Sequence, residues 1–378
     1  MYRRLAVAAA TLAAAAGLSV QPAPAARHML IGIFDEPHTL YGDPGFYFPI
    51  LKRLHTQVLR VNLYWGGRFG VAKQKPFDGS DPADPAYDWS LYDRTVRYAS
   101  QYGIQILFSI YGTPTWANRG HGLNVAPTDP RMLRDFAFAA AIRYSGTYPA
   151  PDGRALPRVH LWLAWNEPNN PVYLTPQYRK VKGKWTIESA IDYTAICSAV
   201  YDGVHATPLA GQVVACGATA PRGNNNPSSS RPSVSPLAFM RALKNDGLSK
   251  FDAYAHHPYY GSPKETPTSR PGPRAVTLAN IGSLIEQLTS LFGKKPLWLT
   301  EYGYQTNPPD PQFGVSWANQ AKYLTQAFGV ARRNPRITMM LWFMVQDEPV
   351  LSGWQSGFLT ATGKRKPAYT AFQRLPRG

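Results

Sequence analysis

The sequence has few cysteines and few acidic residues, and both shortages narrow the class of protein. Two cysteines in 378 residues cannot form a disulfide framework or a cysteine-rich zinc site, which excludes small disulfide-stabilised domains. Asp and Glu number 23 against 40 Lys and Arg, so the formal net charge is +17. The basic residues occur in small groups such as 364–366, without a nucleic-acid-binding motif. We therefore expect no nucleic-acid partner, and the charge indicates either a solvated surface or attraction to an anionic polymer.

Long apolar runs and the common cofactor and metal motifs are also missing. After residue 26 no apolar stretch is long enough to cross a bilayer. No G-x-G-x-x-G sequence follows the first strand-like segment, which disfavours a dinucleotide-binding open sheet. The eight histidines show no H-E-x-x-H or comparable ligand spacing. We therefore predict no membrane insertion, no metal and no cofactor.

Residues 1–26 have the pattern of a secretory signal peptide. Residues 1–4 (MYRR) are positively charged, residues 5–20 are apolar and rich in alanine, and residues 23–25 (APA) provide the small side chains of a cleavage site. The alternative is an uncleaved anchor, for which the apolar run is short. We predict a secreted protein whose mature chain is residues 27–378, with a charge lowered from +17 to about +15 by the loss of two arginines.

The mature chain alternates short apolar runs with amphipathic segments of helical period. Most runs are continuously apolar, as expected for parallel strands buried between a core and a layer of helices. Eight strand-and-helix units in a chain of this length predict a single-domain (β/α)8 TIM barrel. The competing fold is a doubly wound open sheet. The expected strands are Leu30–Phe34, Val58–Tyr64, Ile104–Ile110, His160–Trp165, Gln212–Ala218, Asp252–His257, Pro296–Thr300 and Thr338–Met344.

Two glutamates come directly after the fourth and seventh expected strands. The fourth strand continues into W-N-E-P-N, which contains Asn166 and Glu167, and the seventh into T-E-Y-G, which contains Glu301. Strand C-termini open into the active site of a (β/α)8 barrel, and a buried charge is costly unless it is compensated. A facing pair of carboxyl groups, one protonated and one ionised, is what hydrolysis of a glycosidic bond requires. The alternative for each glutamate is an ordinary salt bridge.

These two motifs resemble those of glycoside hydrolase clan A, the retaining (β/α)8 enzymes that include families 5 and 39. The resemblance covers essentially the whole mature chain and is stronger for the clan than for either family. It implies that Glu167 is the acid/base and Glu301 the nucleophile, and that Asn166 binds the sugar 2-hydroxyl. It also implies cleavage of a β-linked poly- or oligosaccharide by double displacement through a glycosyl-enzyme.

Other positions match the clan pattern. Arg60, near the end of the second strand, is similar to the arginine beside the clan nucleophile, whose charge keeps that glutamate ionised. His257 and Tyr259 resemble the clan's His-x-Tyr pattern, in which the tyrosine orients the nucleophile. Trp342 resembles the tryptophan that forms the floor of the cleaved sugar's subsite, and Trp116 lies in a family 39-like loop. Each residue also has a structural alternative. Arg60 could form an ordinary buried ion pair, and His257 could be a core histidine. Tyr259 could be a plain rim aromatic, and Trp342 could fill the core.

The sequence departs from the clan in two respects. No histidine follows the third strand, where some families of the clan have one. The long loops after the fifth, sixth and seventh strands match no family pattern. Two of these loops, 222–235 and 261–274, are polar and rich in proline, and we expect them at the rim of the barrel. Tyr304, Phe313, Trp317 and Trp354 lie in loops or at helix starts near the cleft and are candidate aromatic residues of the sugar subsites. Cys197 and Cys216 allow either a disulfide or two buried thiols.

The sequence therefore predicts a secreted, monomeric, retaining glycosidase that acts on a polysaccharide or oligosaccharide, with an anionic glycan as one possibility. A transglycosylase, in which a sugar replaces water as the acceptor, has the same residues. A non-catalytic glycan-binding barrel is the alternative from another class, and the pair of costly acids argues against it.

Overall fold

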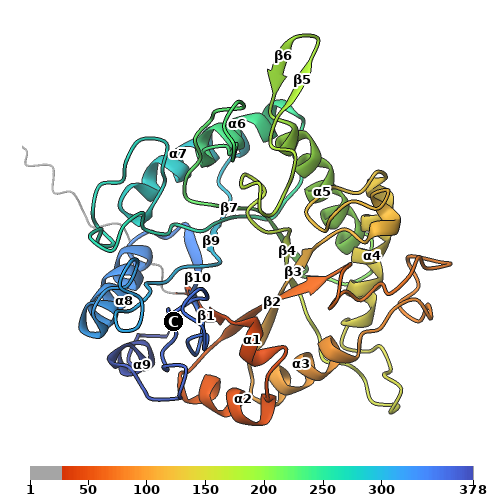
Figure 1. Ribbon diagram of the computed structural model, residues 1–378. Coiled ribbons are helices and arrows are strands. Elements are labelled where there is room, and N and C mark those ends of the chain that lie inside the picture. The colour runs from red at the N-terminus through yellow and green to blue at the C-terminus, as the bar shows by residue number, and fades with distance from the viewer. Residues whose placement is uncertain (1–27, 378) are drawn as a thin grey trace, which may run out of the picture.

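Eight parallel strands close into a barrel at the centre of the molecule (Figure 1). The computed structural model describes residues 28–377, so the predicted signal peptide, residues 1–26, lies outside the described residues. Each strand overlaps one of the expected segments, and β10 closes the barrel by pairing with β1. The predicted (β/α)8 barrel is thus confirmed. The strands are β1 (Leu30–Phe34), β2 (Val58–Tyr64), β3 (Gln105–Tyr111), β4 (Leu161–Ala164), β7 (Val213–Thr219), β8 (Ala253–His256), β9 (Leu297–Leu299) and β10 (Ile337–Phe343).

Helices surround the barrel, and polar residues at their N-termini explain where several of them begin. Asp43 and Asp129 each accept a hydrogen bond from a backbone N–H of the first turn, and a proline occupies the first position of both helices. Ser316 caps a third helix in the same way. The helices are α1 (Glu36–Thr39), α2 (Pro44–Arg53), α3 (Ser90–Gln101), α4 (Pro130–Arg143), α5 (Glu188–His205), α6 (Pro236–Asn245), α7 (Ile281–Phe292), α8 (Trp317–Arg332) and α9 (Pro367–Gln373), with 3-10 turns at Thr115–Ala117 and Leu278–Asn280. None of these helices combines the length and apolarity that a membrane crossing requires.

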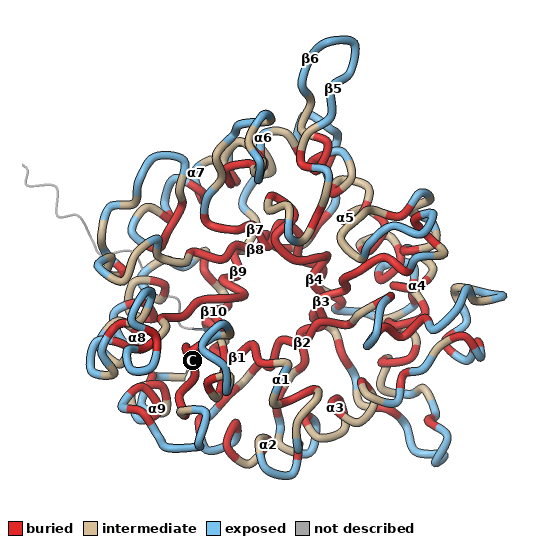
Figure 2. The backbone as a smooth tube through the Cα atoms, in the orientation of Figure 1, coloured by how far each residue is buried: buried red, intermediate tan, exposed pale blue. Residues whose placement is uncertain are grey.

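Side chains of the barrel strands alternate between two apolar layers. Almost every residue of these eight strands is therefore buried (Figure 2). Val58 and Leu341 belong to the cluster inside the barrel, whereas Leu59 and Trp342 belong to the cluster between the strands and the helices. Arg60 follows Val58 by two positions and so points into the barrel, above the apolar layer. The alternation therefore decides which strand residues can reach a site at the mouth of the barrel.

Cys197 on α5 and Cys216 on β7 form a disulfide, with their Cα atoms 5.9 Å apart. The sequence allowed either a disulfide or two buried thiols, and the structure has the disulfide. The bond links a helix to the strand that it covers and closes a loop of 19 residues.

Replacing both cysteines by serine should lower the free energy of unfolding by about 3 kcal/mol, because the open loop gives the unfolded chain more conformational freedom. Chemical denaturation with and without a reducing agent measures this effect. The reductant should destabilise the wild type and leave the double variant unchanged. Equal unfolding midpoints for the two proteins under oxidising conditions would show that the disulfide contributes nothing.

A short hairpin lies outside the barrel. Strands β5 (Arg179–Val181) and β6 (Lys184–Thr186) form a separate two-stranded antiparallel sheet within the loop between β4 and α5. In Figure 1 this hairpin projects away from the rim of the barrel beyond α5.

Candidate active site

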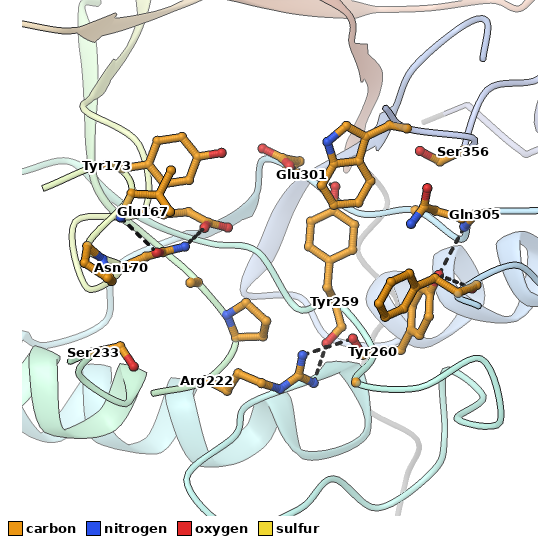
Figure 3. Close-up of a pocket in the computed structure, with 18 of the residues that line it drawn as sticks. Glu167, Asn170, Tyr173, Arg222, Ser233, Tyr259, Tyr260, Glu301, Gln305 and Ser356 are labelled. Atoms are coloured by element: carbon orange, nitrogen blue, oxygen red, sulfur yellow. Dashed lines mark hydrogen bonds between the residues drawn. The ribbon is translucent and has the colours of Figure 1, made fainter. Parts of the chain in front are cut away.

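A cavity of about 670 Å³ opens at the carboxyl end of the barrel, within the size range of small-molecule sites. Its walls come from the loops that follow β4, β7, β8, β9 and β10, and Glu167 and Glu301 both line it (Figure 3). Aromatic side chains and two arginines complete much of the wall. They are Tyr173, Tyr259, Tyr260, Phe313 and Trp354, with Arg222 and Arg231.

The chain turns sharply at the end of β4, where Glu167 is placed. Trp165 and Glu167 have φ angles of 66° and 37°, a left-handed conformation that non-glycine residues seldom adopt and that costs free energy. The segment is held on both sides, because Trp165 N–H donates to Ile110 O and Glu167 N–H donates to Ala218 O, both at 2.9 Å. The neighbouring strands thereby fix the direction in which the Glu167 side chain leaves the backbone.

Glu301 is held by one donor from β2 and one from the loop that follows β8. Arg60 Nη1 donates to Glu301 Oε2 at 3.2 Å, and the Tyr259 hydroxyl donates to Glu301 Oε1 at 2.9 Å. Arg60 is fully buried, and its Cζ lies 4.1 Å from the centre of the Phe34 ring. Burial raises the pKa of Tyr259 well above its usual value, and the nearby Glu301 charge raises it further. The tyrosine therefore stays protonated and can donate its hydroxyl proton to Glu301.

Glu167 has a different environment. Its Oε2 accepts from Asn170 Nδ2 at 2.9 Å, and its Oε1 lies 3.0 Å from His257 Nδ1. Burial raises the pKa of Glu167 to about 7, against a weaker lowering by Asn170 and Arg60. The nearest donors of Glu167 are neutral, whereas Glu301 contacts a guanidinium directly. The two acids therefore have different electrostatic environments, since Glu301 is paired with a cation and burial raises the pKa of Glu167.

His257 connects the two acids. Burial lowers its pKa to about 3, so the ring is neutral. Its Nε2 lies 3.2 Å from Arg60 Nη1 and 3.0 Å from Thr300 Oγ1. Because arginine can only donate, Nε2 is the acceptor and Nδ1 carries the proton that is donated to Glu167. His257 is thus a positioning residue for the acid on β4.

The same nitrogen limits the distance between the acids. His257 Nδ1 lies 3.0 Å from Glu167 Oε1 and 3.7 Å from Glu301 Oε2. The distance between Glu167 Oε1 and Glu301 Oε2 cannot exceed the sum of these two distances. That limit falls at the lower end of the range of about 6.5–9.5 Å for inverting glycosidases and allows the separation of about 5–5.5 Å for retaining ones.

Asn166 and the two predicted tryptophans occupy contrasting places. Asn166 Oδ1 accepts from Arg60 Nη2 at 2.5 Å, which places it beside both acids. Trp342 has no exposed surface, because it faces the helix side of β10, where it packs against Phe358. Trp116 is half-buried against Trp65 and does not line the cavity. The structure therefore brings Asn166 to the acids and neither tryptophan to the cavity wall.

Residues other than Trp342 and Trp116 form the cavity wall. Trp354, in the loop after β10, is 43% exposed and lines the cavity, with its ring 6.2 Å from that of Tyr259. Arg222, in the polar loop after β7, donates to the backbone carbonyls of Tyr259 and Tyr260 (Figure 3). Asn170 was missed by the sequence analysis, although it lies three positions after Glu167 and directly follows the W-N-E-P-N motif.

A third acid near Arg60 lies outside the cavity wall. Glu36 Oε1 accepts from Asn62 N–H at 2.7 Å, and its Oε2 accepts from the Tyr64 hydroxyl at 3.2 Å. Burial raises its pKa to about 7 as well. Within residues 28–377, no group of three or more His, Cys, Asp or Glu side chains is arranged to hold a metal ion.

Comparisons with known proteins agree with this site. Residues 233–368, which contain His257, Tyr259 and Glu301, match the family model "Glycosyl hydrolase catalytic core". No curated protein matches the sequence. The match to the family model supports the prediction of a glycosidase.

Solved structures share the fold at low sequence identity. A family 39 glycoside hydrolase from Bacteroides cellulosilyticus WH2 is 19% identical with a TM-score of 0.61; the match covers 92% of this chain and 63% of that protein. A glucosidase from Croceicoccus marinus is 15% identical (TM-score 0.66, coverage 93% and 68%). A structure from a study of two fungal β-1,4-galactanases is 14% identical (TM-score 0.60, coverage 92% and 100%). This chain thus spans less than two thirds of the family 39 enzyme, and it shares the barrel fold of these three structures.

Proposed function

We propose that this glycosidase of clan A fold is a secreted, retaining enzyme that cleaves β-linked glycans with Glu301 as nucleophile and Glu167 as acid/base. The observation that carries the proposal is the unequal environment of two neighbouring acids. Arg60 and Tyr259 donate to Glu301, whereas burial raises the pKa of Glu167 to about 7. Double displacement needs one ionised and one protonated carboxyl group in one cavity.

In the first step, a Glu301 oxygen attacks the anomeric carbon and forms a covalent ester. The bond from that carbon to the leaving oxygen breaks, and the Glu167 proton moves to that oxygen. Arg60 and Tyr259 hold the attacking carboxylate in place by donating hydrogen bonds to its two oxygens. Glu167 must be within hydrogen-bond reach of the leaving oxygen, so the leaving part of the glycan lies on its side of the cavity.

In the second step, Glu167 removes a proton from water, and the water oxygen displaces Glu301 from the anomeric carbon. Esterification neutralises Glu301, so the nearby negative charge that opposes ionisation of Glu167 is lost and its pKa falls. Glu167 can then act as the base. Two successive displacements give net retention at the anomeric carbon.

The raised pKa of Glu167 predicts an alkaline limit to activity. The first step needs protonated Glu167, so kcat/KM for an unactivated glycan should fall about tenfold per pH unit above about pH 7. A 2,4-dinitrophenyl glycoside, whose leaving group needs no proton, should lack this limb. Glu36→Gln removes the other carboxyl with a pKa raised to about 7 and should leave the limb in place. A profile that is flat from about pH 6 to about pH 9 for both substrates would contradict the assignment.

The substrate and the location of the enzyme are part of the proposal. The fold similarity to β-1,4-galactanases and the aromatic cavity wall support a β-linked glycan, and Arg222 and Arg231 support an anionic one. Export is supported by the N-terminal pattern and by the disulfide, since disulfides persist in oxidising compartments. Because one chain supplies the described cavity wall, we propose that the monomer is active.

The test is a cleavage screen with the purified mature protein. β-Linked galactans, glucans, mannans, xylans and uronic-acid polymers are incubated with the wild type and with Glu301→Gln, and released reducing ends are measured. The proposal expects release from at least one glycan by the wild type alone. Equal release by the two proteins would exclude Glu301 as the nucleophile.

A further inference from the structure

We propose that the β5–β6 hairpin is a docking arm for a polyanionic glycan, a polysaccharide whose sugars carry carboxylates. The position of this glycan relative to the cleaved bond rests on the proposed function. The binding itself needs no catalysis, so it can be tested in an inactive enzyme.

The hairpin is built to display its side chains to solvent. Lys180 pairs with Trp185 and Val181 pairs with Lys184, so the strands are fully in register around a two-residue turn. The turn residues, Lys182 and Gly183, have φ angles of 47° and 81°, which is typical of the tight type I′ turn of hairpins. Figure 1 shows the hairpin projecting from the barrel, and its two strands form a sheet of their own. Residues 179–185 are all exposed.

The arm carries positive charge that the described part of the protein does not neutralise. Arg179 Nη2 lies 2.8 Å from Glu188 Oε1, so its charge is compensated at the base of the arm. Lys180, Lys182 and Lys184 form no salt bridge with any carboxylate of residues 28–377. Three ammonium groups within five residues repel one another, and an anionic polymer would relieve that repulsion.

An aromatic ring accompanies these charges. Trp185 is 48% exposed, and Lys180 Nζ lies 5.8 Å from the centre of its ring. The flat apolar face of an indole can pack against the C–H face of a sugar, and the neighbouring ammonium can pair with a carboxylate on the same sugar. This pairing of side chains matches an acidic sugar better than a neutral one.

The arm begins at the rim of the cavity, on the side of the acid/base. The loop that forms it also carries Glu167, Asn170 and Tyr173, which line the cavity. At its base the Tyr178 hydroxyl lies 3.5 Å from Ser233 O, and Ser233 lies on the Glu167 side of the close-up in Figure 3. The leaving part of the glycan is on that same side in the proposed mechanism. The arm is therefore placed to hold the polymer beyond the cleaved bond.

The pattern favours a glycan over a membrane surface. Side chains alternate along each strand, so Val181 and Trp185 point to opposite faces of the hairpin because Val181 pairs with Lys184 and not with Trp185. Insertion into a bilayer interface needs the apolar side chains on one face. A flexible polyanion can contact both faces of a narrow arm.

Binding is measured in a Glu301→Gln background, which removes cleavage, by affinity electrophoresis in gels that contain polygalacturonate or neutral dextran. The arm variant replaces Lys180, Lys182 and Lys184 by glutamine. The matched control replaces Lys75, Lys294 and Lys322, which are exposed and lie elsewhere, and so has the same net charge. Thermal unfolding of each variant verifies that the barrel remains folded.

We expect polygalacturonate, and not dextran, to retard the protein at low salt, with retardation that weakens as salt rises. The arm variant should bind about tenfold more weakly, whereas the control should stay within about twofold of the parent. Trp185→Ala in the same background should also weaken binding. Equal losses in the arm and control variants would show that net charge alone acts and would overturn the proposal. So would a parent protein that ignores polygalacturonate, or one that instead binds anionic phospholipid vesicles.

Discussion

Replacing Glu301 by glutamine should lower kcat/KM by about 10⁵-fold on every glycan that the wild type cleaves. The amide is nearly the same size as the carboxylate, so Tyr259 and Arg60 keep a hydrogen-bonding partner. It is a poor nucleophile, however, and it no longer offsets the buried Arg60 charge at the reaction centre. Steady-state rates on the glycan found in the screen measure the loss.

The control is the same substitution at an exposed acid. Glu286 lies on the surface of α7, and Glu286→Gln should leave kcat/KM within about twofold of the wild type. A Glu301→Gln protein that is folded and loses less than about tenfold in kcat/KM would contradict the role of Glu301. A loss of activity with a lowered unfolding temperature would be a structural effect, so thermal unfolding is measured for each variant.

Replacing Glu167 by glutamine should have an effect that depends on the leaving group. For an unactivated glycan, kcat/KM should fall by about 10²–10⁴-fold, because no group protonates the leaving oxygen. For a 2,4-dinitrophenyl glycoside the first step should remain fast, and the glycosyl-enzyme should accumulate because water lacks its general base. A burst of dinitrophenol in stopped-flow measurements detects this accumulation.

Azide provides an independent check of the Glu167 role. It needs no base to attack, so it should raise the turnover of Glu167→Gln and release a glycosyl azide, with little effect on the wild type. Asn170→Asp is a useful comparison, because it places a second carboxylate beside Glu167 and should raise the pKa of Glu167 further. Equal losses on activated and unactivated substrates, with no effect of azide, would exclude Glu167 as the acid/base.

The barrel and the two acids could be predicted because their signals are local. Strands such as β2 and β3 are continuously apolar runs, and Glu167 and Glu301 stand out as charges that end such runs. The roles of Arg60 and Tyr259 were predicted only through the resemblance to clan A, and the structure places both beside Glu301.

The tryptophans and the long loops could not be placed in the same way. β10 reads I-T-M-M-L-W-F, which is apolar on both faces, so no alternation indicates whether Trp342 faces the barrel or the helices. Trp354 and Arg222 lie in loops without periodicity, and only their tertiary contacts bring them to the cavity. The β5–β6 hairpin could not be predicted either, because a strand of three residues is too short to produce a pattern.

The most direct test of the central claim is the configuration of the first product. The wild type is mixed with its glycan inside an NMR tube, and the anomeric proton of the newly formed reducing end is followed before mutarotation equilibrates it. Double displacement by Glu301 and Glu167 predicts that this end first appears with the configuration of the bond that was cleaved. First appearance of the opposite anomer would mean a single displacement by water and would contradict the assignment of Glu301 as nucleophile.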